Sequence, residues 1–215
     1  MSSLFYKIFD YVILEKYEGK LNTSSLQFGF KRNSSTHMCT MVLKETISYY
    51  LSNNSSVYCT FLDASKAFDR VNFCPMFRLL LQRGLPPCVV RLIINFYIGH
   101  LISVSWCNSV SNSFVALNGV KQGGVLSPIL FCIYIDNLLI RLSSLGVGCF
   151  IGFNFVGALA YADDIVLVAP TPSAMRLMVA NCDKFAADYD IIFNALKSNF
   201  LVFVSPKDIV LCVRL

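Results

Sequence analysis

The segment Leu159–Val168, LAYADDIVLV, restricts the fold more than any other stretch of the chain. Apolar residues that favour β-strands lie on both sides of Asp163 and Asp164, and the segment contains no Lys or Arg. Two carboxylates about 4 Å apart repel each other by roughly 4 kcal/mol at an effective dielectric constant of about 20. We therefore expect two strands joined by a bend that carries the acidic pair, and a chemical reason for placing it there.

The composition is that of a densely packed protein with a modest positive charge. Hydrophobic residues make up 55% of the chain and charged residues only 14%, which excludes a disordered chain. A length of 215 residues is enough to bury one good core, which two lobes can share. The formal net charge of +5 is compatible with a polyanionic partner but does not require one.

The cysteines indicate reduced thiols rather than a metal site or a disulfide framework. The nine cysteines form no C-x-x-C pair and only His37 and His100 could join them, so a zinc site is not expected. An odd number without a spacing pattern is typical of an intracellular protein, in the nucleus or the cytoplasm. The first twenty residues carry scattered charges, so no signal peptide is expected.

Two long runs without acidic or strongly basic residues leave a membrane protein as an alternative. Leu142–Ala162 and Leu92–Val120 are both long enough for a transmembrane helix. The first run contains several glycines and Asn154, however, and the second is broken by His100 and by an Asn/Ser-rich turn. These interruptions favour buried strands, and no membrane contact is expected.

Helical and strand patterns are mixed without regular alternation, which favours an α+β fold with an antiparallel sheet backed by helices. Helices are expected at Met41–Leu51, Cys74–Gly84, Pro86–Gly99, Ser127–Ser143 and Pro172–Tyr189. Strands are expected at Val57–Asp63, Leu101–Cys107, Ser113–Leu117, Cys149–Phe155, Gly157–Tyr161, Ile165–Ala169, Ile191–Phe193 and Phe200–Val204.

Three carboxylates lie at the ends of these expected strands. Asp63 ends one strand, and Asp163 and Asp164 lie at the bend between two others. If the strands are neighbours, the carboxylates share one space and need a cation, and ligation by oxygen alone favours Mg²⁺ or Mn²⁺. Two such ions about 4 Å apart stabilise the attacking and leaving oxygens of a phosphoryl transfer. The alternative is an exposed turn, where an Asp-Asp pair is ordinary.

Five segments resemble sequence boxes of the reverse transcriptases, most closely those of non-LTR retrotransposons. YADD alone is weak evidence, but five boxes in the family's order over roughly residues 5–204 are specific. In chain order the boxes are LQFGFKRNSST (Leu26–Thr36), FLDASKAFDRV (Phe61–Val71), GVKQGGVLSPILFCIYIDNL (Gly119–Leu138), YADD (Tyr161–Asp164) and FNALKSNFLVF (Phe193–Phe203).

The resemblance implies an RNA-directed DNA polymerase with a right-hand palm. Such an enzyme transfers nucleotides from deoxynucleoside triphosphates to the 3′-hydroxyl of a DNA primer on an RNA template. By the resemblance, Asp63 and Asp163 hold the two Mg²⁺ (or Mn²⁺) ions, and Asp164 is the third acid, which ligates less directly. The implied division is a partial fingers segment at residues 1–56, a palm at 57–205 and a tail at 206–215, with no thumb.

Further residues match family positions that contact the incoming nucleotide. Phe68 lies where the family has an aromatic ring beneath the sugar, a position that excludes a ribose 2′-hydroxyl; the alternative is an ordinary core phenylalanine. Gln122 and Gly123 lie in a glycine-rich loop that a nucleotide or template strand can approach closely. The alternative for Gln122 is an amide that stabilises its own turn.

Three basic residues complete the expected site. Lys31 and Arg32 lie in a hydroxyl-rich loop suited to phosphate contacts, and the alternative is an exposed loop with two charges. Lys197 matches the lysine of the last box, where it would protonate the pyrophosphate leaving group; the alternative is a surface lysine.

A second hypothesis shares this fold but not the activity. The chain resembles a palm cut short at both ends, and an inactive retroelement remnant would keep the same acids. Oligomeric state, template preference, target site and host are not readable from these residues.

Overall fold

The computed structural model describes residues 4–99, 101–121 and 123–205. The chain divides into two compact units. A helical unit comprises Met1–Asn22 and Phe68–Tyr134, and a sheet unit comprises Thr23–Ala67 and Ile135–Leu215. The predicted division at residues 56 and 205 follows the family's boxes rather than compactness, and it stays a prediction.

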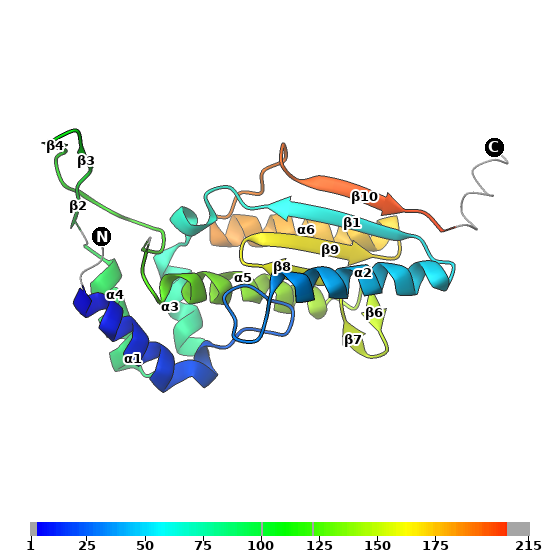
Figure 1. The fold of residues 1–215 in the computed structure, drawn as a ribbon, viewed down its shortest axis with the longest axis horizontal. Helices are drawn as coiled ribbons and strands as arrows, with labels where there is room; N and C mark the ends of the chain where they lie inside the picture. Colours follow the sequence, from blue (N-terminus) through cyan, green and yellow to red (C-terminus); the bar gives the residue numbers. More distant parts are fainter. Residues whose placement is uncertain (1–3, 100, 122, 206–215) are drawn as a thin grey trace. The chain divides into compact units, whose positions relative to one another are not determined.

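The sheet unit is built on four antiparallel strands in the order β10-β1-β9-β8 (Figure 1). Central strand β1 pairs with β10 on one side and β9 on the other, and β8 pairs with β9. Every residue of β9 after Asp164 is buried, because the strand lies inside the sheet with both faces covered. The strands are β1 (Val57–Asp63), β8 (Ala158–Tyr161), β9 (Asp164–Ala169) and β10 (Asn199–Phe203).

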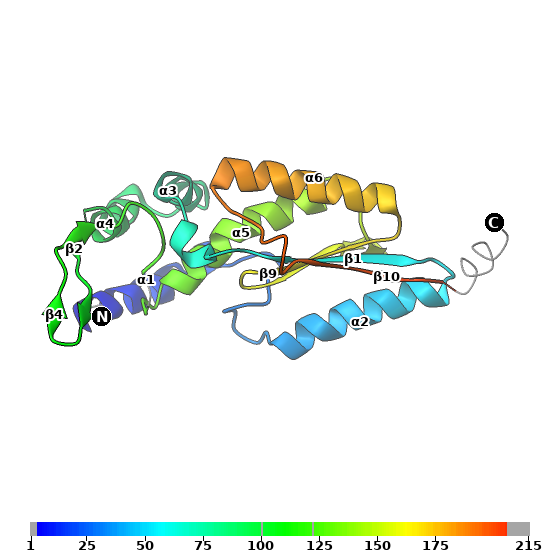
Figure 2. The ribbon, with the colours of Figure 1, turned by 90° about the horizontal axis from the view of Figure 1, so that it is seen from above.

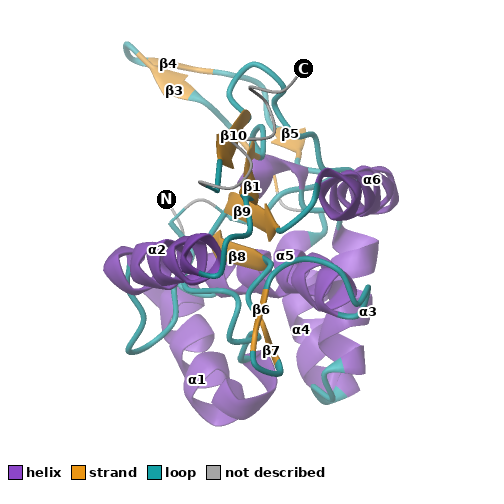
Figure 3. Cartoon of the chain, turned by 90° about the vertical axis from the view of Figure 1, so that its right-hand side faces the viewer, coloured by secondary structure: helices purple, strands orange, loops and turns teal. Residues whose placement is uncertain are grey.

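Helices α2 (Thr36–Ser52) and α6 (Pro172–Tyr189) lie on opposite faces of this sheet, as Figures 2 and 3 show. The hydroxyl of Ser35 accepts a hydrogen bond from the amide of Met38 at the start of α2, at 3.3 Å. The hydroxyl of Thr171 does the same for α6, and Pro172 occupies the first helical turn, where its missing N–H costs nothing. These caps explain why both helices begin where they do.

Helix α5 (Ser127–Ser143) is apolar on nearly all sides, which is typical of a helix buried in a core. Leu130, Ile133, Ile135 and Leu138 are fully buried along it. A short hairpin of β6 (Phe150–Ile151) and β7 (Asn154–Phe155) follows and leads into β8.

Aromatic side chains make several of the packing contacts within the helical unit. On α3, Phe73 and Phe77 pack against Tyr97 of α4, with ring centroids 5.8 and 6.5 Å from the Tyr97 ring. On α1, Tyr6 and Phe9 contact the ring of Phe96 edge-on, at 4.9 and 4.7 Å. The helices are α1 (Leu4–Leu21), α3 (Phe73–Gln82) and α4 (Pro87–Tyr97), with a 3-10 turn, η1 (Ala67–Arg70), before α3.

The structure confirms the α+β class and most expected elements, and it corrects three. Residues 101–117 form two small exposed ribbons rather than two longer strands, because their apolar side chains are exposed and pack against no covering layer that would sustain a longer strand. Residues 149–155 turn back at Gly152, whose φ is +59°, and form the β6–β7 hairpin instead of one strand. Residues 191–193 form no strand, because only Phe193 makes a single bridge, to Ala64. The ribbon strands are β2 (Leu101–Ile102), β3 (Ser105–Trp106), β4 (Ser109–Val110) and β5 (Phe114–Val115).

The membrane alternative is not supported. Leu142–Ala162 contains the end of α5 and strands β6, β7 and β8 rather than one helix. Within the described residues, no helix is both long and apolar enough to cross a bilayer. Helix α1 was not predicted, because its apolar residues do not gather on one face.

Candidate active site

The sheet brings two of the three predicted acids directly opposite each other. Asp63 ends β1 and Asp164 begins β9, and the antiparallel register pairs these two residues. Residues opposite each other in an antiparallel pair project from the same face of the sheet. The two carboxylates, about a hundred residues apart in the chain, therefore share one side of the same sheet edge.

Asp163 lies in the tight turn that joins β8 to β9. Tyr161 pairs with Asp164, so Ala162 and Asp163 are the two central residues of a hairpin. Ala162 has a φ of +59°, whereas Asp163 is not among the described residues with positive φ. This pattern is that of a type II′ turn, in which the first central position is usually glycine. Here an alanine takes that position.

The charge of Asp164 is unfavourable at this position, partly because of the neighbouring acids. The pKa of the Asp164 carboxyl is raised above its ordinary value, first by partial burial and then by the charges of Asp163 and Asp63. A cation bound between these carboxylates would offset the repulsion of Asp164 by Asp163 and Asp63. The three acids are therefore more stable with a bound metal ion than without one.

The donor set fits Mg²⁺ better than a metal that needs a complete protein cage. Among the described residues, no three His, Cys, Asp or Glu side chains converge closely enough to hold a metal by themselves. Magnesium is commonly bound by one or two carboxylates, with water and substrate phosphates completing its shell. Asp63 and Asp164, with Asp163 beside them, supply this kind of partial shell.

Lys197 lies at the same edge of the sheet. Its Nζ is 3.9 Å from Oδ2 of Asp63, and the two side chains are 68% and 33% exposed. A pair this long and this exposed contributes little stability, so its interest is its position. The loop before β10 is fastened to β1, because the amide of Asn194 donates to the Asp63 carbonyl at 2.8 Å and the Asp63 amide donates to the Ser198 hydroxyl.

The basic loop after the first box is arranged differently from the expectation. Lys31 is half-buried, and its ammonium donates to the carbonyls of Thr23 and Ser24 at 3.2 and 3.0 Å. Arg32 is exposed. Lys31 therefore closes its own loop, and phosphate contact stays a prediction for both residues.

Phe68 and Gly123 belong to the helical unit. The ring of Phe68 stacks on Phe131 of α5 with centroids 4.6 Å apart, and its carbonyl accepts the amide of Val120 at 2.8 Å. Gly119 has a φ of +87° and packs against the backbone of Asp69. A Cβ added at Gly119 would lie 3.0 Å from backbone atoms of Asp69. These contacts tie the glycine-rich loop to the end of the second box. Gly123 is exposed, and Gln122 lies outside the described residues.

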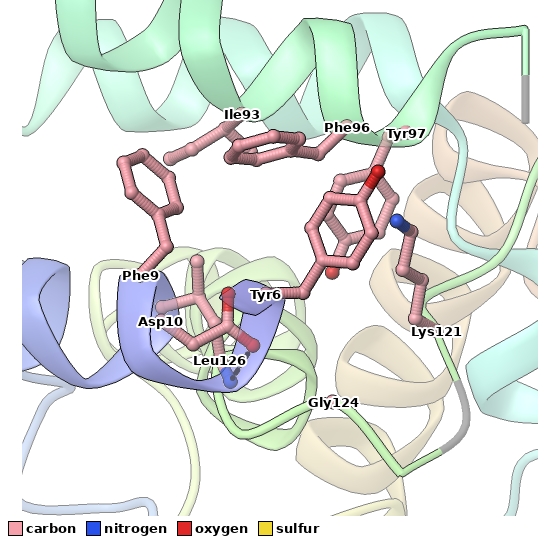
Figure 4. Close-up of a pocket in the computed structure, with 9 residues that line it drawn as sticks. All are labelled: Tyr6, Phe9, Asp10, Ile93, Phe96, Tyr97, Lys121, Gly124 and Leu126. Carbon is pink, nitrogen blue, oxygen red and sulfur yellow. Dashed lines mark hydrogen bonds between the residues drawn. The ribbon is translucent and has the colours of Figure 1, made fainter. Parts of the chain in front are cut away.

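A hollow in the helical unit, shown in Figure 4, contains a residue that the sequence did not single out. Oδ2 of Asp10 accepts the amides of Val125 and Leu126, at 3.0 and 3.2 Å, immediately before α5. Nζ of Lys121 lies 4.5 Å from the centre of the Tyr6 ring. Burial raises the pKa of Asp10 and lowers that of Lys121. Asp10 thus holds the loop before α5, and a lone acid in an apolar segment was the only signal for it.

Gln27 is the other residue that was missed. It is 1% exposed, and its side chain hydrogen-bonds to Ala162 in the acidic turn. The sequence predicts phosphate contacts for the first box through its basic residues and no role for its glutamine. The available signal was a glutamine between two apolar residues and followed by Gly29.

Comparison with known proteins gives one family and several relatives. A family model described as "Reverse transcriptase (RNA-dependent DNA polymerase)" matches residues 2–209. The chain is 36% identical over 142 residues to the Pol polyprotein of the type-2 retrotransposable element R2DM of Drosophila melanogaster, covering 66% of this chain and 13% of that protein. It is 26% identical over 200 residues to the Pol polyprotein of a type-1 R2 element of Popillia japonica, covering 92% of this chain and 28% of that protein.

Solved structures show the same fold at low identity. The apo telomerase of Candida tropicalis, truncated from its C-terminal domain, superposes with a TM-score of 0.66 and 14% identity, covering 94% of this chain and 44% of that one. The telomerase of Candida albicans in complex with a fragment of telomeric RNA gives a TM-score of 0.60 and 12% identity, covering 92% and 33%. The chain spans about an eighth to a quarter of the first two curated relatives, by the coverages of 13% and 28%.

Proposed function

The chain belongs to the reverse transcriptase (RNA-dependent DNA polymerase) family, and from that premise we propose that it carries the polymerase centre of a retroelement enzyme. The predicted relation to non-LTR elements is confirmed by relatives from R2 elements and from the X-element of Drosophila melanogaster. The proposed reaction is nucleotidyl transfer from a deoxynucleoside triphosphate to the 3′-hydroxyl of a DNA primer paired with an RNA template. The free thiols of the described cysteines are consistent with an intracellular setting.

The observation that carries this proposal is the register of β1 against β9. It pairs Asp63 with Asp164 next to Asp163, and the pKa of Asp164 responds to both neighbouring charges. We assign all three acids to the binding of Mg²⁺. When bound, Mg²⁺ would promote ionisation of the primer hydroxyl and offset the charge of the triphosphate.

The protein's own groups orient and protonate the substrates. Asp63 and Asp163 would be the main ligands of Mg²⁺, whose charge would help to orient the reacting oxygens, and Asp164 would add negative charge beside them. Lys197 is proposed to protonate the pyrophosphate as it leaves, and the position of its Nζ, 3.9 Å from Oδ2 of Asp63, supports this assignment. Arg32 and Gln122 are proposed to contact phosphate and template, and Phe68 to contact the incoming sugar.

The test is primer extension by the full chain on an RNA template with Mg²⁺. Asp163→Asn removes one charge without changing side-chain size, and it is expected to abolish extension. Asp183→Asn is the matched control, because Asp183 is exposed on α6 and apart from the turn. Loss of extension in both variants would contradict a specific role for Asp163. A folded chain that extends no primer would refute the proposal and leave the inactive remnant.

A further inference from the structure

The side chain of Gln27 makes three hydrogen bonds, and two of them are to the backbone of a single residue, Ala162. Its Oε1 accepts the amide of Ala162 at 3.0 Å and the amide of Gly29 at 2.8 Å. Its Nε2 donates to the carbonyl of Ala162 at 3.2 Å. The carboxamide therefore hydrogen-bonds to both the backbone N–H and the carbonyl of Ala162, and Gln27 is buried from solvent.

Ala162 is a residue that needs such support. Its φ of +59° lies in the left-handed region, which glycine adopts freely and alanine does not. Strained backbone of this kind persists where the surroundings hold it in place, and it is concentrated at functional sites. Asp163 and Asp164 follow directly, so the direction of both carboxylates depends on this one residue.

The backbone around Gln27 fits the same turn closely. Residues Leu26 and Phe28 hydrogen-bond to Ala160, at 2.9 and 2.8 Å, and extend the sheet beyond its edge strand β8. Gly29 packs directly on the turn, since a Cβ there would lie 2.3 Å from the nitrogen of Ala162. Glutamine and glycine are thus required at these two positions for different reasons, one polar and one steric.

We propose that Gln27 is a positioning residue of the polymerase centre, which holds the Ala162 peptide so that Asp163 and Asp164 face Asp63. This inference rests on the function proposed above, because the acids must be the catalytic ones for their direction to matter. The chemical requirement is specific. An amide supplies one donor and one acceptor, whereas an ionised carboxylate would set an acceptor against the Ala162 carbonyl and bury a charge.

The first measurement is hydrogen exchange at the amide of Ala162, followed by NMR in the full chain. In the unmutated protein this amide is expected to be protected, although it lies in a two-residue turn. Gln27→Met keeps the side-chain length and removes the hydrogen bonds, so protection of Ala162 is expected to fall at least tenfold. The amide of Leu167 in β9 is the internal reference and keeps its protection. An unprotected Ala162 amide in the unmutated chain would overturn the proposal without any variant.

Gln27→Glu tests the donor requirement within one protein. When its carboxyl is protonated, it offers one donor and one acceptor as the amide does, so Ala162 is expected to be protected at low pH. Ionisation removes the donor, and protection is expected to be lost as the pH rises. Protection that is independent of pH would contradict the role assigned to Nε2.

Activity separates positioning from general stability. Gln27→Met is expected to lower kcat by about tenfold or more while KM for the nucleotide changes less than about twofold, since small displacements of catalytic groups act mainly on the chemical step. Thr46→Val is the control for stability. Thr46 is fully buried in the same unit and bonds only within α2, to the Val42 carbonyl, so kcat per folded molecule should not change.

A rescue completes the test. Adding Ala162→Gly to Gln27→Met is expected to restore much of the lost kcat, because glycine adopts the turn's backbone without support. No recovery in the double variant, or an equal loss of kcat in Thr46→Val, would overturn the proposal. If the unmutated chain shows no extension at all, the proposed function fails instead, and the exchange measurements still decide whether Gln27 holds the turn.

Discussion

Replacing Gly29 by alanine tests how tightly the first box is fitted to the acidic turn. The added Cβ would lie 2.3 Å from the Ala162 nitrogen and 2.9 Å from its Cα. Both neighbours are backbone atoms, which cannot swing aside as a flexible side chain does. The segment and the turn must therefore separate by about 1 Å to reach ordinary contact.

The magnitude follows from this separation. Overpacking of a close-fitted site costs about 1–3 kcal/mol, and at this chain length that lowers Tm by about 2–12 °C. The same displacement acts on Asp163 and Asp164, and a misplacement of about 1 Å at a catalytic centre costs about 100-fold in rate. We therefore expect Gly29→Ala to lose far more activity than stability.

The assay compares Gly29→Ala with Gly19→Ala by thermal unfolding and by primer extension on RNA. Gly19 lies in α1 with no atom within 4 Å of its added Cβ, so alanine there is expected to be neutral or stabilising by about 0.5–1 kcal/mol. If the two variants are equally stable and equally active, the close contact between the first box and the turn does not exist in solution, and the reasoning is refuted.

Two further predictions concern charge. In metal-free buffer Asp164→Asn is expected to stabilise the fold at neutral pH, because a carboxyl whose pKa is raised in the folded state destabilises that state when ionised. This gain in stability should shrink as the pH falls through the pKa of Asp164 in the folded state. Adding Mg²⁺ should raise the Tm of the unmutated chain more than that of the variant. A stability gain that is constant at every pH would contradict the prediction. Asp10→Ala is expected to lower stability by about 1–2 kcal/mol by urea unfolding, because two amides before α5 lose their acceptor. Asp10→Asn, which keeps an acceptor oxygen, should lose less stability, and equal losses in the two variants would argue against stabilisation through these two hydrogen bonds.

Several elements were readable because their signals are local. Helix α6 starts at Pro172 after a capping threonine, and α5 begins at Ser127 with an apolar run that extends to Ile135. Strand β1 was predicted with its exact bounds, since apolar residues end at a single acid. The ribbons after α4 were mistaken for longer strands because β-branched and aromatic residues occur there without the burial that sustains a strand.

The sequence by itself determined which family the chain resembles and which acids are candidates for its site: three carboxylates at strand ends, a turn between apolar strands, and five boxes in the order of one family. Only the tertiary structure decided which groups meet. The pairing of Asp63 with Asp164 depends on strand register, and the grip of Gln27 on Ala162 joins residues 135 positions apart. Contacts of this kind are set by packing of distant segments against each other, and local residue patterns carry no record of that packing.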